Sequence, residues 1–467
     1  MFFKKFHRIV PILSIFILPI NLTAKGPWKK IDSFLESDQL NQINTGIAII
    51  DLSNGKLIYN HNNKKLFVPA SNVKLLTAYT ALKKLNPRFT FTTSFSTDSI
   101  IDSLRIHNLV IKSNGDHFMT MAEINLIVLT ISKRIKAIEG DVIVDNSSFD
   151  STSLGKGWMW DDKNSLIAPF SFNNNRINFT ISPGIHEGDP LIIIPEPLTG
   201  FVNTVVHALT GKEDNLSIKQ VVNEQGDEFI FSGTSPLSLG KRTLSYPVSR
   251  PGLFASTLIK ELLQNYGISV SGTARSFDIK DTMKTLATFE SPSLSTVLSH
   301  MLKESNNLSS ECILKSIGLV EKGAPGDADA GICAIKRELS ALGIKEKDYR
   351  IVDGSGLSTY NLISPQIIVS VLKAAYDDFT IYPEFVSSLS IGGIDGTLAN
   401  RFKGTMIENQ IRGKTGTLSG VCSLSGYLKT RHGRFLAFSI IFNGFVGSSA
   451  PVREAQDEIV RMIFEEM

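Results

Sequence analysis

The feature that most constrains this 467-residue chain is a set of three short polar motifs that lie far apart in the sequence. Each supplies one part that acyl transfer through a serine needs: a nucleophile with an amine base, a proton relay, and a cation at a strand edge. A fold that uses all of them must bring an early helix, a helix break and a late strand to one pocket. The motifs are Ser71-Asn72-Val73-Lys74, Ser305-Asn306-Asn307 and Lys414-Thr415-Gly416-Thr417.

The first motif pairs a serine with a lysine at the start of a helical pattern that ends before Pro87. Ser71 and Lys74 are three residues apart, so a helix places them on one face. A serine hydroxyl becomes a good nucleophile when a base takes its proton, and a buried lysine beside a second cation can be that base. Backbone N–H groups at the helix start would stabilise an oxyanion. Taken alone, the pattern also fits a helix cap followed by a surface lysine.

The second motif lies at a break between two helical patterns. In the catalytic interpretation, Ser305 passes a proton to the leaving amine, and the Asn307 amide holds both Lys74 and a substrate carbonyl. The neighbouring Asn306 has no required role. Taken alone, a cluster of Ser and Asn is more typical of a loop or a cap.

The third motif is expected to open the last set of strands. Lys414 gives a fixed positive charge for a terminal carboxylate, and the hydroxyl groups of Thr415 and Thr417 add hydrogen bonds. Gly416 leaves room for a ligand backbone to pair along the strand edge. The N–H of Thr417 could complete an oxyanion hole with that of Ser71. The alternative for this motif alone is an exposed turn.

The hydrophobic periodicity predicts one α+β domain that is split by an insert. Helical patterns and an early hairpin surround a long stretch of short strand-like runs, which are separated by Gly, Asn, Asp and Pro and indicate one or two small β-rich domains. We expect the split domain at 25–88 and 246–467 and the insert at 89–245. The elements expected outside the insert are a hairpin at 46–52 and 56–59, helices at 251–266, 294–303, 308–320 and 451–464, and strands at 417–428 and 435–442.

Residues 1–24 are expected to be a cleaved secretion signal. Lys4, Lys5 and Arg8 precede an apolar run at 9–20, and small residues follow it. A membrane span needs about 20 apolar residues, and this run is shorter and contains two prolines. The mature protein is therefore predicted to be periplasmic or otherwise exported.

Charge and cysteine content exclude several classes of function. The formal net charge is +3, and the basic residues of the N-terminal segment account for it, so the body has no excess charge that would favour nucleic acid. The pattern of Cys312, Cys333 and Cys422 is too sparse for a disulfide framework; a single pair is conceivable, but small buried residues fit better. No clustered His or Cys motif indicates a metal, and we expect no cofactor.

Together the motifs resemble those of the penicillin-binding and serine β-lactamase superfamily, S-x-x-K, S-x-N and K-T-G. Further stretches make the chain similar to class C low-molecular-mass penicillin-binding proteins, the D-alanyl-D-alanine carboxypeptidase/endopeptidase (peptidase S13) family. These stretches are Pro69-Ala70-Ser71, Gly157-Trp158-x-Trp160-x-Asp162, Asp353-Gly354-Ser355-Gly356-Leu357-Ser358 and Asp395-Gly396-Thr397-Leu398.

The resemblance implies a penicillin-binding/serine β-lactamase-like domain, an antiparallel sheet flanked by helices, with the insert forming extra domains. It implies a serine D,D-peptidase that acts on peptidoglycan stem peptides through an acyl-Ser71 intermediate and is inhibited by β-lactam antibiotics. A serine β-lactamase and a non-catalytic peptidoglycan-binding protein are the alternatives. The balance of carboxypeptidase and endopeptidase activity, the oligomeric state and membrane association of the mature form stay open.

Overall fold

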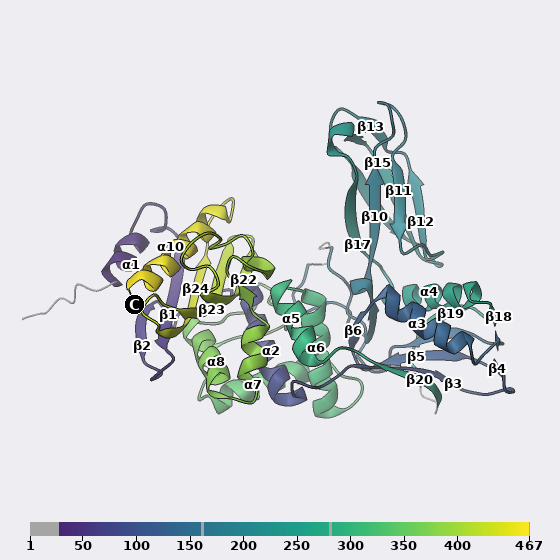
Figure 1. Ribbon diagram of the computed structural model, residues 1–467, viewed down its shortest axis with the longest axis horizontal. Helices are drawn as coiled ribbons and strands as arrows, with labels where there is room; N and C mark the ends of the chain where they lie inside the picture. Colours follow the sequence, from purple (N-terminus) through teal and green to yellow (C-terminus); the bar gives the residue numbers. More distant parts are fainter. Residues whose placement is uncertain (1–27, 160–162, 280–282, 467) are drawn as a thin grey trace, which may run out of the picture.

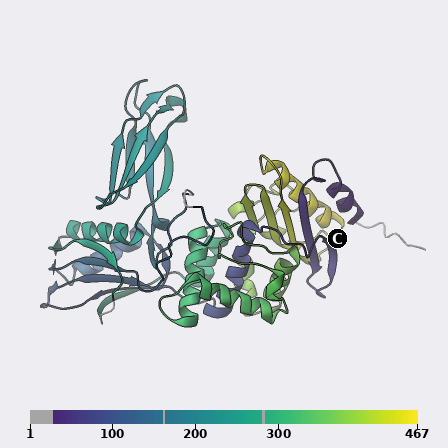
Figure 2. The ribbon, with the colours of Figure 1, turned by 180° about the vertical axis from the view of Figure 1, so that it is seen from behind.

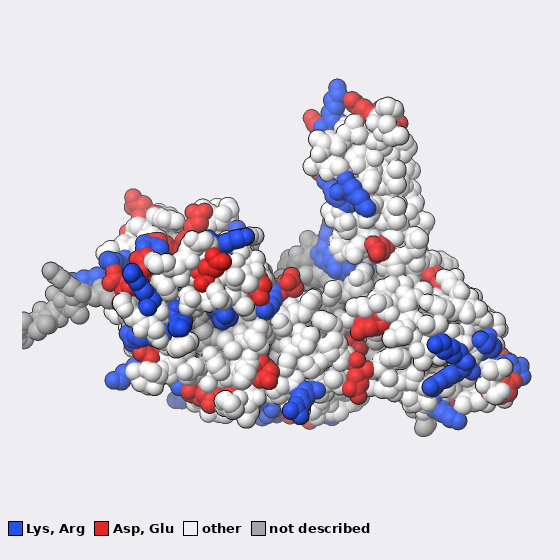
Figure 3. Space-filling view, viewed as in Figure 1, with Lys and Arg blue, Asp and Glu red and all other residues white. Residues whose placement is uncertain are grey.

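The computed structural model describes residues 28–159, 163–279 and 283–466. The predicted signal at 1–24, together with Trp160 and Asp162, lies outside the described residues. The part that carries the three motifs, called the catalytic part below because of its predicted role, lies on one side, and the inserted part lies on the other. Together they give the molecule an elongated shape, and a slender group of strands projects from the inserted part (Figures 1 and 2). Figure 3 shows basic and acidic side chains on both parts of the face drawn.

The catalytic part is built on a six-stranded antiparallel sheet in the order β2-β1-β24-β23-β22-β21. The strands alternate sides as a pleated sheet requires: Ile47 and Ile49 face one core, and Ala48 and Ile50 face another. Both faces are therefore covered. The strands are β1 (Asn44–Asp51), β2 (Leu57–His61), β21 (Ser390–Ile391), β22 (Ile411–Leu418), β23 (Val421–Lys429) and β24 (Phe435–Asn443).

Helices cover both faces of this sheet. The core on one face is closed by α1 (Trp28–Leu35) and α10 (Ala450–Glu466). A larger group packs on the other face and carries two of the three motifs. Its members are α2 (Val73–Leu85), α5 (Leu294–Lys303), α6 (Asn307–Lys322), α7 (Ala328–Ala341), α8 (Pro365–Asp377) and α9 (Tyr382–Ser387).

The inserted part next to the catalytic part contains a five-stranded sheet in the order β19-β8-β5-β3-β20, with two helices packed on it. The parallel pairs β5 with β8 and β8 with β19 distinguish it from the antiparallel catalytic sheet. Two smaller sheets, β18-β7-β4 and β6-β9, complete this region of the inserted part. The elements of the region are β3 (Thr92–Thr97), β4 (Arg105–Ile106), β5 (Leu109–Ser113), β6 (Asp116–Met119), α3 (Met121–Ser132), β7 (Ala137–Ile138), β8 (Val142–Asp145), β9 (Phe170–Phe172), α4 (Pro251–Asn265), β18 (Ser269–Val270), β19 (Ala274–Phe277) and β20 (Lys284–Glu290).

The projecting strands form three small sheets, whose orders are β11-β10-β17, β12-β15-β14 and β13-β16. Aromatic rings fill the space between them: Phe179 contacts Phe229 and Phe231 edge to face. The strands are β10 (Arg176–Ser182), β11 (Ile192–Glu196), β12 (Val202–Val206), β13 (Leu209–Gly211), β14 (Ser217–Val222), β15 (Asp227–Ser232), β16 (Thr234–Pro236) and β17 (Arg242–Pro247).

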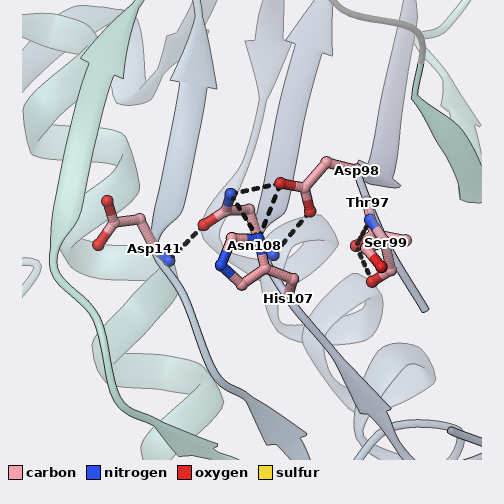
Figure 4. Close-up of polar contacts among 6 residues, drawn as sticks. All are labelled: Thr97, Asp98, Ser99, His107, Asn108 and Asp141. Atoms are coloured by element: carbon pink, nitrogen blue, oxygen red, sulfur yellow. Dashed lines mark hydrogen bonds and ion pairs between the residues drawn. The ribbon is translucent and has the colours of Figure 1, made fainter. Parts of the chain in front are cut away.

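A polar network ties the loops of the five-stranded sheet together (Figure 4). The Asp98 carboxylate lies 2.9 Å from Nδ1 of His107 and accepts bonds from the backbone and the side-chain amide of Asn108. The side-chain oxygen Oδ1 of Asn108 in turn accepts from the backbone N–H of Asp141 at 2.7 Å. These bonds are exposed and involve nearby backbone groups, so the network serves to hold the loops in place.

The α+β class is confirmed, and most expected elements appear within a few residues of their predicted ends. The strand expected at 417–428 is wrong in one respect: a turn at residues 419–420 divides it, so the third motif lies inside β22 and does not open the strand set. Gly420 adopts a φ of 66°, which suits that tight turn.

The predicted division at residue 246 differs from the packing. Helix α4 buries Phe254, Leu258 and Leu263 in the core of the insert, and β19 and β20 pair with β8 and β3. The sequence predicts a helix at 251–266, and the structure has one there, but the apolar face of this helix packs against the inserted sheet. As a division into independently folding domains, the boundaries at 25–88, 89–245 and 246–467 remain a prediction.

Within the described residues, no helix is long and apolar enough to cross a membrane. The three cysteines are free; Cys312 and Cys422 are buried, as expected, whereas Cys333 is exposed.

Candidate active site

The first motif forms a tight turn that leads into α2. Ala70, Ser71 and Asn72 make one turn of 3₁₀ helix, and Ala70 has a φ of 48°, which a non-glycine residue rarely adopts. The Asn72 side chain is buried and donates to the carbonyl oxygen of Lys414 at 3.1 Å. The turn is thereby fixed against β22, with Ser71 half-buried at its surface.

Lys74 reaches the serine from one turn further along. Its ammonium donates to Oγ of Ser71 at 3.1 Å, to Oδ1 of Asn307 at 2.7 Å and to the backbone oxygen of Ser355 at 2.7 Å. These neutral oxygens use all three of its donors. Burial lowers the pKa of Lys74 to about 8, while the charges of Asp353 and Glu311 act in the opposite direction. A lysine with this pKa can exchange a proton near neutral pH.

The same spacing elsewhere shows how much the setting matters. Ser370 and Lys373 are also three residues apart on a helix, α8. Ser370 donates to the backbone oxygen of Gln366, however, and Lys373 pairs with Asp377. The Ser-x-x-Lys spacing therefore does not create a reactive pair without the surrounding burial.

The second motif forms the junction between α5 and α6. Ser305 has a φ of 56°, and its hydroxyl accepts a hydrogen bond from the ammonium of Lys414 at 2.8 Å. Asn307 is the first residue of α6 and reaches Lys74. Asn306, for which no role was predicted, caps α6 through Ser309 and donates to Oδ1 of Asn174 in the insert at 3.0 Å.

The third motif lies on the half of β22 that extends beyond its short partner β21. The strand β21 pairs with β22 only at Arg412 and Gly413. Lys414 is fully buried, and burial together with the charge of Lys74 lowers its pKa well below the usual value. A Cβ on Gly416 would lie 2.9 Å from the backbone nitrogen of Ser71, so this glycine permits the close approach.

The two threonines of the third motif differ in their surroundings. Thr415 donates to Oγ1 of Thr397 at 2.8 Å, which joins β22 to the 395–398 segment. Thr417 is exposed and lies opposite Cys422 in the strand register. The structure thus brings Ser71, Lys74, Ser305, Asn307 and Lys414 into one connected site, and the catalytic roles assigned to these residues remain predictions.

The sequence marked residues 353–358 as one of the stretches that resemble the family, but it did not reveal that this turn supports Lys74. Asp353 organises this turn by accepting bonds from the backbone N–H of Gly356 and Ser358 and from the side chain of Asn361. The indole N–H of Trp158, from the insert, donates to the same carboxylate at 3.0 Å. A Gly-rich stretch that follows an acidic residue signals such a turn but does not reveal what it packs against.

A cavity of about 220 Å³ adjoins the site on the side of the insert. It is lined by Trp158, Asn174 and Arg176 from the insert and by Asn306 and Asn307 of the second motif. Within the described ranges, no group of three or more His, Cys, Asp or Glu side chains could hold a metal ion. The chemistry that Ser71 and Lys74 offer is that of a serine activated by a neighbouring amine.

Comparison with known proteins shows the family of the chain. A family model described as the D-Ala-D-Ala carboxypeptidase 3 (S13) family matches residues 28–465. The chain belongs to this family. The match covers both parts of the molecule and makes the protein a serine peptidase of the D,D-type; it does not favour the β-lactamase or the non-catalytic alternative.

Relatives and solved structures agree with this. A D-alanyl-D-alanine carboxypeptidase of Actinomadura sp. is 28% identical over 498 residues, 98% of this chain and 90% of that protein. The D-alanyl-D-alanine carboxypeptidase DacB of Haemophilus influenzae is 26% identical and covers 95% of this chain and 94% of its own. The crystal structure of penicillin binding protein 4 from Haemophilus influenzae has a TM-score of 0.82 at 23% identity, covering 93% of this chain and 99% of that one.

Proposed function

We propose that the protein cleaves the D-alanyl-D-alanine end of peptidoglycan stem peptides through an ester on Ser71. The observation that carries the proposal is the 3.1 Å contact between the Ser71 hydroxyl and the ammonium of Lys74, whose three donors all go to neutral oxygens of the described residues and not to a carboxylate. In its neutral form this lysine can take the serine proton.

The proposed steps of the reaction follow from which groups lie next to Ser71. Lys74 takes the proton of Ser71 as Oγ attacks the carbonyl carbon of the scissile bond, and N–H groups at the turn and on β22 stabilise the oxyanion. The C–N bond then breaks, and the leaving amine receives a proton through Ser305. Water hydrolyses the ester and restores the serine.

Recognition of the substrate is assigned to β22. Beyond Gly413 this strand has an edge free of β21, along which an extended peptide can pair. Lys414, Thr415 and Thr417 would bind the terminal carboxylate, and Gly416 would let the peptide backbone approach. The names of the relatives, D-alanyl-D-alanine carboxypeptidases, support this substrate.

We also propose that β-lactams acylate Ser71 and that the mature protein works outside the cytoplasm after removal of residues 1–24. A penicillin binding protein 4 of the same fold has been solved in complex with a β-lactam. The residues of the nucleophile centre fall within 25–88 and 246–467, the ranges assigned to the catalytic domain.

Labelling with a fluorescent penicillin tests the nucleophile. The wild-type protein and the matched variant Ser370→Ala, which removes the serine of the other helical Ser-x-x-Lys pair, should both be labelled. Ser71→Ala should not be. Labelling of Ser71→Ala at the wild-type level would reject the assignment. Release of D-alanine from a stem pentapeptide, followed by mass spectrometry of digested peptidoglycan, separates removal of a terminal residue from opening of cross-links.

A further inference from the structure

Glu311 is a fully buried carboxyl group directly behind the site. It lies on α6, one turn after Asn307, so both side chains face the same way. Its Oε1 accepts hydrogen bonds from the backbone N–H groups of Gly354 at 3.0 Å and Ser355 at 2.8 Å. Its Oε2 is buried and has no hydrogen-bond partner among the described residues.

These bonds fix the peptide that holds the lysine. The carbonyl oxygen of Ser355 accepts from Lys74 at 2.7 Å. The preceding carbonyl, that of Gly354, accepts from the hydroxyl groups of Thr77 on α2 and Ser310 on α6, each at 2.7 Å. Glu311 thus binds the N–H groups of the Gly354–Ser355 segment, and the carbonyl oxygens of the same segment bind Thr77 and Lys74 on α2.

The charges around this segment are few and buried. Lys74 and Lys414 supply the positive charge, and Asp353 and Glu311 supply the negative charge. The next cation along α6, Lys315, is bonded to Asp150 and to a backbone oxygen of the insert. Neither carboxylate touches the Lys74 ammonium, so each acts on it through the low-dielectric interior.

We propose that Glu311 is a positioning residue for the general base: it fixes the Ser355 carbonyl against Lys74, and its negative charge maintains the basicity of that lysine. This inference rests on the proposed role of Lys74. Burial alone would make the neutral amine so favourable that it would hold the serine proton poorly. The Glu311 carboxylate binds Ser355, which in turn binds Lys74, so its charge lies near the lysine without contacting it. It therefore offsets part of the effect of burial on the lysine pKa, and it forms no salt bridge that would hold Lys74 in its ammonium form.

The pKa shifts of the two groups agree with the proposal. Burial, and then the neighbouring Asp353 charge, raise the pKa of Glu311, whereas burial lowers that of Lys74. The charges of Asp353 and Glu311 act against the effect of burial on Lys74, so an ionised Glu311 favours the ammonium form of the lysine.

The test is Glu311→Gln, in which the side-chain oxygen still accepts both N–H bonds while the charge is lost. Because a carboxylate favours the ammonium form, its removal should lower the Lys74 pKa, and the acidic limb of the penicillin acylation profile should move down by about one pH unit. The plateau rate should fall roughly tenfold because a weaker base removes the proton less well. The matched control is Glu321→Gln near the end of α6, where the carboxylate is partly exposed and pairs with Arg337.

The outcomes separate this inference from the proposed function. A wild-type protein that penicillin does not label at Ser71 would end the proposed function itself. Normal Ser71 labelling with an acidic limb unmoved in Glu311→Gln would overturn only the role of Glu311. A lower rate without a moved limb would mean a purely structural role and would also overturn it. If Glu311→Gln does not fold, Glu311→Met takes its place; it removes the charge at similar volume but also leaves the N–H groups of Gly354 and Ser355 without this acceptor, so only the direction in which the limb moves is compared, and it should be the same.

Discussion

At the residue scale, the site depends on a lysine held in place by oxygens that carry no charge. The hydroxyl of Ser71, the amide of Asn307 and the carbonyl of Ser355 orient the ammonium of Lys74 without stabilising it as strongly as a bonded carboxylate would. Its burial then lowers the cost of losing the proton. Position and basicity are in this way set by different groups.

The pH dependence of acylation follows from this arrangement. Lys74 accepts the serine proton only in its neutral form, and its pKa is about 8. Below that pH the penicillin acylation rate should rise about tenfold per pH unit, and it should level off above it. Stopped-flow labelling of the wild-type protein between about pH 6 and 9.5 measures the profile across that pKa. A rate that is flat over this whole range would contradict a neutral Lys74 as the base.

The residues that form the polar network around Ser71 could be predicted, whereas those that support them could not. Ser71, Lys74, Asn307 and Lys414 were found because their chemistry requires particular residue types in short motifs. Glu311 has no such motif, and in the sequence it is one of many acidic residues in a helical pattern. Its burial follows only from the packing of α6 against α2 and the 353–358 turn.

At the element scale, the 353–358 turn is the structure that presses against the nucleophile. Gly356 has a φ of 78°, and a Cβ at this position would lie 1.9 Å from the carbonyl oxygen of Ala70. The turn therefore contacts the backbone next to Ser71 while its other carbonyl groups hold Lys74 and Thr77. A glycine is needed here for both the conformation and the close approach.

Replacing Gly356 separates these two effects when it is compared with a matched site. Gly343 has the same φ of 78°, but a Cβ at that position would meet nothing within 4 Å, so Gly343→Ala adds only conformational strain, roughly 1 kcal/mol. Gly356→Ala must in addition displace the Ala70 carbonyl. We expect it to lower the free energy of unfolding by a further 1–3 kcal/mol, about the cost of overpacking, and to slow penicillin acylation more than tenfold.

Chemical denaturation and labelling rates measure both quantities. Equal effects of Gly343→Ala and Gly356→Ala on stability and on acylation would show that the turn does not press on the nucleophile. A stability loss at Gly356 without a slower acylation would mean that the backbone of Ala70 yields without moving Ser71.

At the scale of the whole molecule, the insert is joined to the catalytic part through buried and partly buried polar contacts. Trp158 donates to Asp353, Asn306 donates to Asn174, and Lys315 pairs with Asp150. The sequence predicted an insert from its strand-like runs, but these contacts join segments more than a hundred residues apart. No local pattern encodes them, which is why the packing of α4 with the insert was also missed.

His117 lies at this junction and makes it sensitive to acid. Its ring is buried, Nδ1 lies 2.9 Å from the backbone oxygen of Gly115, and its neighbour Phe118 packs edge to face against His300 of α5. Burial lowers the pKa of His117 from 6.5 to about 4. Because the folded state binds this proton less readily than the unfolded chain, the stability from the neutral ring is present above pH 6.5 and is lost as pH falls toward 4.

The neighbouring Asp116 acts in the opposite sense. Burial raises its pKa from 3.8 to about 6, so its protonated form is favoured in the folded state and its contribution to stability is lost as pH rises through 6. The two groups partly cancel in the wild-type protein. The effect of His117 therefore has to be isolated by substitution and cannot be read from the wild-type curve alone.

We expect His117→Asn, whose amide can still donate to the Gly115 oxygen, to flatten the acid limb of the stability curve. A pKa difference of about 2.5 corresponds to about 3 kcal/mol, so between about pH 7 and pH 4 the wild-type protein should lose about that much more free energy of unfolding than the variant. Urea denaturation at both pH values measures this, with His186→Asn at an exposed loop as the control. Curves for the wild type and His117→Asn that stay parallel would show that His117 is not the group that weakens the junction.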